Sequence, residues 1–305
     1  GREILGHVAA MRAMLAMIGS DLPEAVALAQ RADELLPPDK PVPRNTIAST
    51  LARAYYDEGE LVRARQAMLE ELRFGQESDN VWTIVRSLCD LADLAIVQGQ
   101  LGKATELCRQ ALQEAEVRGA RQFGTVGYAL VKLGEIAYQR GDLIAASEQA
   151  SEGVDLMQGW QQPYEMVGSH TGLAAILQAR GDDLGALEML QRAETMQARH
   201  PNYRRLDSLI RACRIELCLA QEGPVEAARQ ATDIRLGERG APIYQEQEQL
   251  ILARVLAAGK KWDEVLPLLA RMARAAEAGG RFGRLIEVLV LQAVALWAEG
   301  NTVQA

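Results

Sequence analysis

Charged side chains recur along this chain at a spacing of about forty residues. Arg53, Asp93 and Glu135 each stand six residues before a glycine, in a row whose other members are small or apolar. A surface that combines hydrogen-bonding groups with aromatic faces suits a sugar, a nucleotide-like molecule or a peptide. We therefore predict a ligand-binding groove, to which neighbouring positions of the same pattern add Tyr56, Arg86, Asp90, Tyr128, Lys132, Tyr138, His170, Thr171 and Gln178.

These charges also have an interpretation without a ligand. Arg53 and Asp93 would pair across adjacent repeats, and the remaining polar side chains would form a solvated helix face. If the groove interpretation holds, changing Arg53 and Glu135 together to alanine should abolish ligand binding and leave the melting temperature nearly unchanged.

The most basic stretch of the chain has two interpretations as well. It would bind an anion or an acidic partner, or its arginines would pair with nearby carboxylates in solvent. The stretch consists of Arg199, His200, Arg204, Arg205, Arg211 and Arg214.

No residue pattern typical of catalysis or metal binding is present in the sequence. The three histidines, His7, His170 and His200, show neither an HExxH motif nor a cluster with cysteines. No Ser-His-Asp arrangement or GxxxxGK[ST] phosphate loop can be found either. We therefore expect this chain to be no enzyme and to hold no cofactor and no metal.

The composition narrows the class of protein and of partner. The 305 residues are 49% hydrophobic but only 5% aromatic, so Ala, Leu, Val and Met must close the core, which favours closely packed helices. A formal net charge of −8 argues against binding to nucleic acid or to an anionic membrane, since both require a positive field. The longest apolar runs are too short to span a membrane.

The cysteines indicate the compartment. Cys89, Cys108, Cys213 and Cys218 show no CxxC spacing and lie in helical patterns. We expect them to be buried, reduced thiols, and we expect the protein to be cytoplasmic.

The elements that must position the groove are marked by a repeated glycine. A Gly-polar-apolar triplet begins at Gly59, Gly99 and Gly141. Each glycine lies between two helical stretches, where a helix ends in the left-handed conformation that glycine adopts at little cost. Looser copies, which keep the spacing at 36 to 42 residues, begin at Gly19, Gly181, Gly223, Gly259 and Gly300.

Small residues recur on both sides of these glycines, which would let the two helices of a hairpin approach closely. Seven positions before the glycine they are Ala52, Ala92, Gly134 and Ala174. Five positions after it they are Ala64, Ala104, Ala146, Ala186 and Ala228, with Ala25 as the counterpart in the first copy.

The pattern predicts a series of helical hairpins. A hairpin cannot bury its apolar face alone, so neighbours must stack. We predict an all-α, right-handed superhelix of about seven and a half hairpins that forms one domain over residues 1–305, and we expect it to be part of a longer protein because the array ends within a hairpin. The expected pairs are 2–18 with 22–36, 44–58 with 60–75, 79–98 with 100–118, 121–140 with 142–158, 161–180 with 182–198, 202–222 with 224–236 and 242–258 with 260–278, followed by a helix at 282–299.

The small residue, the hairpin glycine and the following alanine, as in Gly134, Gly141 and Ala146, resemble tetratricopeptide (TPR) repeats. The period near 40 residues is longer than the usual value of about 34. This long repeat, together with segments 7–13, 19–25 and 283–293, resembles the sensor region of MalT-like, LuxR-type ATP-dependent transcriptional activators.

The resemblance implies a function for the groove. In such regulators a P-loop ATPase precedes the superhelix and a helix-turn-helix follows it, and neither motif occurs in this chain. The superhelix binds a small-molecule inducer or a regulatory protein and thereby controls oligomerisation and promoter binding, so self-association is a further expectation. The alternative is a generic TPR scaffold or adaptor that binds partner proteins in the same groove.

Overall fold

Helices form nearly all of the structure, so the predicted all-α class is confirmed. The computed structural model describes residues 1–37, 41–121, 124–160, 162–203, 205–234 and 243–300. Within these ranges the chain forms fifteen α-helices, one short 3-10 helix and no strand. They are α1 (Arg2–Ile18), α2 (Leu22–Leu35), α3 (Pro41–Glu58), α4 (Leu61–Glu77), α5 (Val81–Val97), α6 (Leu101–Val117), α7 (Gly124–Gln139), α8 (Leu143–Leu156), α9 (Pro163–Ala179), α10 (Asp183–Arg199), α11 (Arg205–Gln221), α12 (Pro224–Gln230), η1 (Ala231–Asp233), α13 (Ile243–Ala258), α14 (Trp262–Ala278) and α15 (Phe282–Glu299).

The helices pair as the sequence predicts, with one difference in the sixth hairpin. A helix is expected over 224–236, but α12 ends at Gln230 and η1 follows it. The Thr232 hydroxyl donates a hydrogen bond to the Arg229 carbonyl at 3.0 Å. Thr232 and Asp233 have lower helix propensities than the alanines before them, which favours an end of α12 here. Residues 235–236 lie outside the described part of the chain.

Most of the hairpin glycines adopt the predicted left-handed conformation. Their φ angles lie between +73° and +97° at Gly59, Gly99, Gly141, Gly181, Gly223 and Gly300. Gly19 and Gly259 do not, because the residue after each of them takes that role: Ser20 has a φ of 65° and Lys260 a φ of 57°. The prediction was therefore wrong at these two turns, where the glycine directly follows the helix and the left-handed residue comes one position later.

The small residues bring the paired helices into backbone contact, as predicted. A Cβ atom at Gly134 would lie 2.8 Å from the carbonyl oxygen of Ala146, the small residue opposite it in the pattern. One assignment shifts: in the sixth hairpin the buried residue is Ala227, while Ala228 is only partly buried. The shift arises because α12 begins directly after Gly223, whereas the other clear copies have one residue between the glycine and the helix.

The fully buried Ala104 provides a test of the hairpin packing. Ala104→Leu is expected to lower the free energy of unfolding by about 1–3 kcal/mol, because the added side chain must push α6 away from its neighbours. Urea denaturation followed by circular dichroism measures the loss. An unchanged midpoint would show that this position does not pack at the helix contact.

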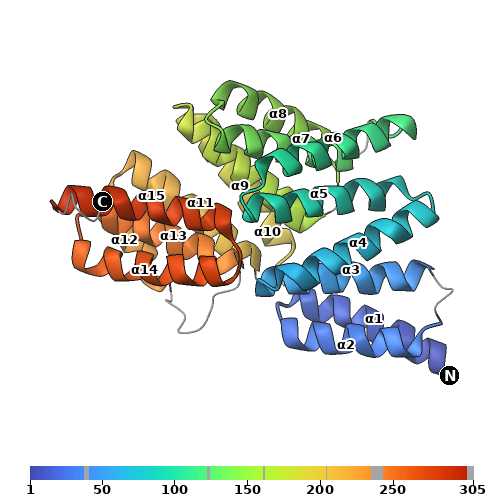
Figure 1. The fold of residues 1–305 in the computed structure, drawn as a ribbon. Coiled ribbons are helices and arrows are strands. Elements are labelled where there is room, and N and C mark those ends of the chain that lie inside the picture. Colours follow the sequence, from blue (N-terminus) through green and yellow to red (C-terminus); the bar gives the residue numbers. More distant parts are fainter. Residues whose placement is uncertain (38–40, 122–123, 161, 204, 235–242, 301–305) are drawn as a thin grey trace.

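The hairpins follow one another along a curved path (Figure 1), which makes the chain an all-α solenoid. The first helices of successive hairpins contact each other, as α5 does α7 and α7 does α9. The curve brings distant repeats together, since α13 contacts α3 and α15 contacts α5. At the second contact the backbones are so close that a Cβ atom on Gly283 would lie 2.5 Å from the Ile96 oxygen.

The outer face of α15 is apolar and exposed. Trp297 is 69% exposed, and the same helix exposes Phe282, Ile286, Leu289, Val290 and Val294. Apolar faces of this kind often contact other proteins or other parts of a chain. The self-association expected from the sequence stays a prediction.

Candidate functional site

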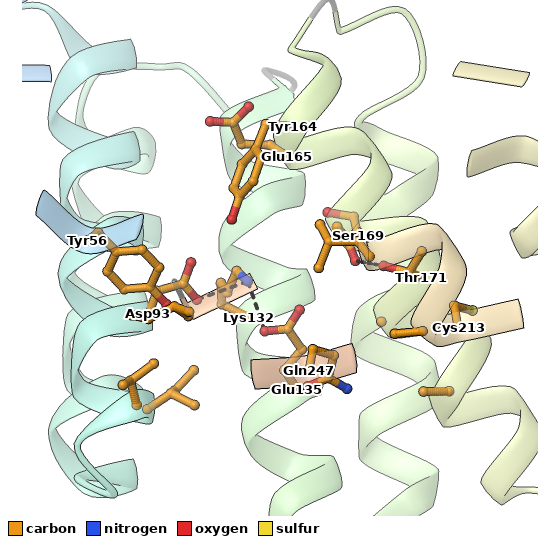
Figure 2. Close-up of a pocket in the computed structure, with 18 of the residues that line it drawn as sticks. Tyr56, Asp93, Lys132, Glu135, Tyr164, Glu165, Ser169, Thr171, Cys213 and Gln247 are labelled. Carbon is orange, nitrogen blue, oxygen red and sulfur yellow. Dashed lines mark hydrogen bonds and ion pairs between the residues drawn. The ribbon is translucent and has the colours of Figure 1, made fainter. Parts of the chain in front are cut away.

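A cavity of about 310 Å³ lies at the centre of the curve, and we refer to it as the central cavity (Figure 2). All of its lining residues belong to the first helices of hairpins, as expected for the concave face of a solenoid. They are Tyr56, Asp57, Asp93, Ile96, Val97, Tyr128, Lys132, Glu135, Tyr164, Glu165, Gly168, Ser169, Thr171, Gly172, Ala175, Leu209, Ala212, Cys213, Glu216, Ile243, Gln247 and Arg284.

The central cavity crosses the superhelix obliquely. It meets α3 at Tyr56, near the helix C-terminus, and α7 near the middle, at Lys132. It meets α13 and α15 near their N-termini, at Gln247 and Arg284. From α3 to α15 the contributing part moves from the C-terminal end of the helix to the N-terminal end, with α9 and α11 contributing similar parts. A given offset from the hairpin glycine therefore lies inside the cavity in one repeat and outside it in another.

Lys132 pairs with two carboxylates in the central cavity. Its ammonium donates to Asp93 Oδ1 and to Glu135 Oε2, both at 2.9 Å, and these contacts are drawn in Figure 2. The Tyr128 hydroxyl donates to the other oxygen of Asp93 at 3.0 Å. Burial opposes the charge on Lys132, but the carboxylates of Asp93 and Glu135 outweigh it and hold the pKa of Lys132 well above its ordinary value.

The same burial acts on the neighbouring acids. It raises the pKa of Glu135, an effect that Lys132 opposes and Asp93 reinforces. Burial also raises the pKa of Tyr128, to which the charge of Asp93 adds. The pKa of Tyr56 is raised by burial as well, so the hydroxyls of Tyr56 and Tyr128 stay protonated near neutral pH.

The raised pKa of Glu135 predicts a pH dependence of stability. Between the ordinary and the raised pKa the folded chain binds more protons than the unfolded chain, so this contribution to stability is present at low pH and is lost as the pH rises. We expect the stability of Glu135→Gln relative to the wild type to be highest at pH 7.5 and to fall towards pH 5. Melting temperatures of both proteins across this range measure the effect.

The wild type and Glu135→Gln must be compared directly, because a second titrating group, His170, changes stability with pH in the opposite direction. Burial lowers the pKa of His170, so its contribution to stability is lost as the pH falls. His170 is present in both proteins and cancels in the difference. A difference that stays constant or grows as the pH falls would contradict the assignment to Glu135.

Arg53 lies at the boundary between the central cavity and a second cavity of about 270 Å³. Tyr164 and Glu165 line both cavities, and the Arg53 guanidinium lies over the Tyr164 ring at 4.1 Å from its centre. Arg53 Nη2 is 3.5 Å from Asp90 Oδ1 and 3.9 Å from Glu165 Oε1. Its partner in the next repeat is thus Asp90, whereas the interpretation without a ligand expects Asp93, which binds Lys132 instead.

Arg86 connects this boundary to the hairpin behind it. It donates to Asp90 Oδ2 at 2.9 Å and to the Ser49 hydroxyl at 3.0 Å, and it pairs with Glu71 of α4. Glu71 is fully buried and was not found by sequence reasoning, which considered first helices only. Its position was detectable, because Glu71 falls on the stripe of α4 that contains the buried residues Ala64 and Met68.

The comparison with protein families identifies the type of helical repeat in this chain. The model of the MalT-like TPR region matches residues 6–305. The chain belongs to the MalT-like TPR family. The resemblance found in the sequence is thereby confirmed.

Several solved structures share the fold of this MalT-like TPR region. The apo form of RapI is 11% identical, with a TM-score of 0.55 over 98% of this chain and 99% of that one. A Rap protein complexed with Competence and Sporulation Factor is 15% identical, with a TM-score of 0.61 over 94% of this chain and 75% of that one. The Rap conjugation gene regulator of plasmid pLS20, in complex with the Phr* peptide, is 14% identical, with a TM-score of 0.59 over 95% and 74%. At these identities the likeness shows a shared fold, and no curated protein sequence matches the chain.

Half of the predicted site residues line the central cavity of this MalT-like TPR region. These six are Tyr56, Asp93, Tyr128, Lys132, Glu135 and Thr171. Arg53 and Arg86 line the second cavity, and the buried Asp90 contacts both of them. Sequence reasoning missed the residues from the N-terminal halves of α9, α11 and α13, including Tyr164, Glu165, Cys213 and Gln247.

Besides Asp90, three predicted residues line neither cavity. Tyr138 and Gln178 share with Tyr56 the position three residues before the hairpin glycine, but the oblique cavity has left this level of the helix by α7 and α9. His170 Nδ1 donates to the Met166 carbonyl at 2.6 Å, and the residue lines a separate pocket between α9 and α10. Ser169 and Thr171 on either side of it face the cavity, and the turn of about 100° per residue directs the side chain between them away.

The expectation for the double alanine change at Arg53 and Glu135 is also corrected. Both side chains are largely buried and hold charged partners, so their removal would lower stability as well as any binding. A loss of binding in that variant would not separate the two effects.

Two arginines of the basic stretch pair with carboxylates, as the interpretation without a ligand expects. Arg214 pairs with Glu194 at 2.6 Å, and Arg211 Nε is 3.5 Å from Glu248. Arg204 and the side chain of Arg205 lie outside the described residues.

The remaining chemical groups are simple to place. All four cysteines are free and buried, as predicted, and burial raises the pKa of Cys108 and of Cys213 to about 12. Among the residues that the structure describes, no cluster of three or more His, Cys, Asp or Glu side chains has the arrangement to hold a metal ion. No helix in the described ranges is long and apolar enough to cross a membrane.

Proposed function

We propose that this chain is the effector-sensing domain of a LuxR-type, MalT-like transcriptional activator and that the effector binds in the central cavity. The observation that carries the proposal is the cavity itself, about 310 Å³ in volume and lined by helices from α3 to α15. This volume is at the lower end of the range of about 300–1,000 Å³ for small-molecule sites. Membership of the MalT-like TPR family supports it.

The position of the cavity supplies a route from binding to regulation. A ligand that contacts α3, α9 and α13 at once would favour the curved form in which α15 contacts α5. Domains attached outside residues 1–305 would sense this change in curvature and alter oligomerisation and promoter binding. Peptides are one ligand class to include, because two Rap structures of the same fold contain a peptide or a factor as their bound partner.

A thermal-shift screen of the chain against metabolites and short peptides tests the proposal, because a ligand of the folded state raises the melting temperature. The matched variant is Gly168→Leu. A Cβ atom at Gly168 would meet nothing within 4 Å, so leucine there should fill the cavity without disturbing the fold. A ligand that stabilises the wild type should not stabilise this variant, and equal stabilisation of both would place the binding elsewhere.

The activator role has its own test in the parent gene. It should encode a P-loop ATPase before this region and a helix-turn-helix domain after it. A gene without either would overturn the activator proposal.

The second candidate, a TPR scaffold, is favoured by the exposed apolar face of α15. A gene without the two domains would favour this scaffold. A partner protein would then bind the outer face and be unaffected by Gly168→Leu.

A further inference from the structure

The charges around the central cavity are unbalanced. Two cations line it, Lys132 and Arg284, and both are already engaged. Lys132 is held between two carboxylates, while Arg284 donates to Gln247 at 2.8 Å and pairs with Glu287. An anionic ligand would therefore find no unengaged cation among the described lining residues and would face the carboxylates of Asp57, Asp93, Glu135, Glu165 and Glu216, of which Glu216 pairs with Arg254 outside the lining.

One of these carboxylates lacks a hydrogen bond. Glu165 is only 8% exposed, and it accepts no hydrogen bond from any residue in the described part of the chain. Its one charged contact is Arg53 at 3.9 Å, which is beyond hydrogen-bond distance. A buried carboxylate without a donor is costly, and a donor supplied by a ligand would remove that cost.

A second carboxylate oxygen of the cavity lies close to the backbone of a glycine. Glu135 binds Lys132 through Oε2, and its Oε1 faces Gly172, where an added Cβ atom would be 3.1 Å away. One turn earlier, Gly168 leaves room for further atoms. The two glycines of α9 thus form a part of the wall from which no side chain projects.

The rest of the wall suits an organic cation. The rings of Tyr56, Tyr128 and Tyr164 line the cavity, and aromatic faces attract cations within about 6 Å. The chain already uses these rings in this way, since Arg53 lies over Tyr164 and Lys132 lies 5.2 Å from the centre of Tyr128. Ile96, Val97 and Leu209 provide apolar surface for the uncharged part of a ligand.

We propose that the central cavity binds an organic cation, in which an ammonium or guanidinium group donates hydrogen bonds to Glu165 and an apolar body packs against the tyrosines. The inference rests on the proposed function and narrows its ligand class. It removes the nucleotide-like molecule from the candidates that the sequence allowed, because phosphates would meet the carboxylates. The cationic group can belong to a free amine or to a lysine or arginine side chain of a peptide.

Three probes of similar shape and different charge test the proposal by calorimetry on the whole chain. They are 2-phenylethylamine, which is cationic, 2-phenylethanol, which is neutral, and 3-phenylpropionate, which is anionic. The amine is expected to bind about tenfold or more tightly than the alcohol, and the anion should give no heat. Acetyl-Ala-Lys-Ala-amide and its norleucine counterpart form the peptide arm, and binding of the lysine peptide alone would identify a peptide as the source of the cation.

Two variants locate the bound cation. Glu165→Gln should weaken amine binding about tenfold, since a charge-assisted hydrogen bond is lost, and leave binding of the alcohol unchanged. The control is Glu34→Gln, at an exposed side chain in α2, which should bind the amine as the wild type does. Gly168→Leu should abolish binding of all probes and keeps the test valid if Glu165→Gln unfolds the chain.

The outcomes separate this inference from the proposed function. If the alcohol or the anion binds as tightly as the amine and Gly168→Leu removes that binding, the cavity is a ligand site but the cation inference is wrong. If amine binding survives Gly168→Leu, the cation lies elsewhere and the inference is overturned. If none of the probes binds while a metabolite or peptide from the thermal-shift screen does so through the cavity, that ligand replaces the organic cation.

Discussion

Arg53→Met is expected to lower the free energy of unfolding by about 3–5 kcal/mol, the usual cost of removing one partner from a buried charge cluster. The guanidinium is buried, lies over the Tyr164 ring and is 3.5 Å from Asp90 and 3.9 Å from Glu165. Methionine keeps much of the volume but leaves Glu165 without its cation and Asp90 with Arg86 alone. Urea denaturation followed by circular dichroism measures the loss.

An exposed pair provides the control for this prediction. Arg31 contacts Glu34 at 3.3 Å, with both side chains more than half exposed, so Arg31→Met should change stability by no more than about 1 kcal/mol. Adding Glu165→Gln to Arg53→Met should recover part of the loss, because Arg53 is the one described cation within ion-pair distance of Glu165. Equal stability of the Arg53 and Arg31 variants would mean that solvent screens the cluster and that the boundary between the two cavities is open to water.

The second large effect is expected at a glycine inside a helix. A Cβ atom at Gly127 would lie 2.4 Å from the carbonyl oxygen of Gly153, so Gly127→Ala forces α7 and α8 apart. Because the obstacle is backbone on the facing helix, we expect a loss of at least about 3 kcal/mol, at the upper end of the range for overpacking. The midpoint of thermal or urea unfolding measures it.

Gly168→Ala is the matched control, since Gly168 also lies within a first helix. An added Cβ atom there meets nothing within 4 Å, so alanine should stabilise the chain by about 0.5–1 kcal/mol through its better helix propensity. The two substitutions are chemically identical and should have opposite signs. A destabilised Gly168→Ala protein or a neutral Gly127→Ala protein would show that the packing of α7, α8 and α9 differs from that described.

The two predictions concern two different kinds of contact between helices. Gly127 and Gly153 set how closely two helices of one hairpin approach, while Arg53 connects first helices of separate hairpins across the concave face. The first interaction is local in the repeat and the second depends on the curvature of the whole array. Binding in the central cavity depends on the second kind.

The sequence by itself determined the hairpins. The glycine at each turn and the small residues on both sides of it, such as Gly134 and Ala146, predict where helices end and where they touch, because these are requirements of local backbone geometry. The same residues carry the resemblance to the MalT-like TPR family, which the family comparison confirms.

Only the tertiary structure decided which side chains share the cavity. Tyr56, Tyr138 and Gln178 have the same offset from the hairpin glycine, yet Tyr56 alone lines the cavity, and Arg53 meets Asp90 where sequence reasoning expected Asp93. The reason is physical: each hairpin is rotated and shifted against the one before, by an amount set by the packing between hairpins. A repeating pattern defines positions within one hairpin, and the path of a cavity across several hairpins follows from their accumulated rotation.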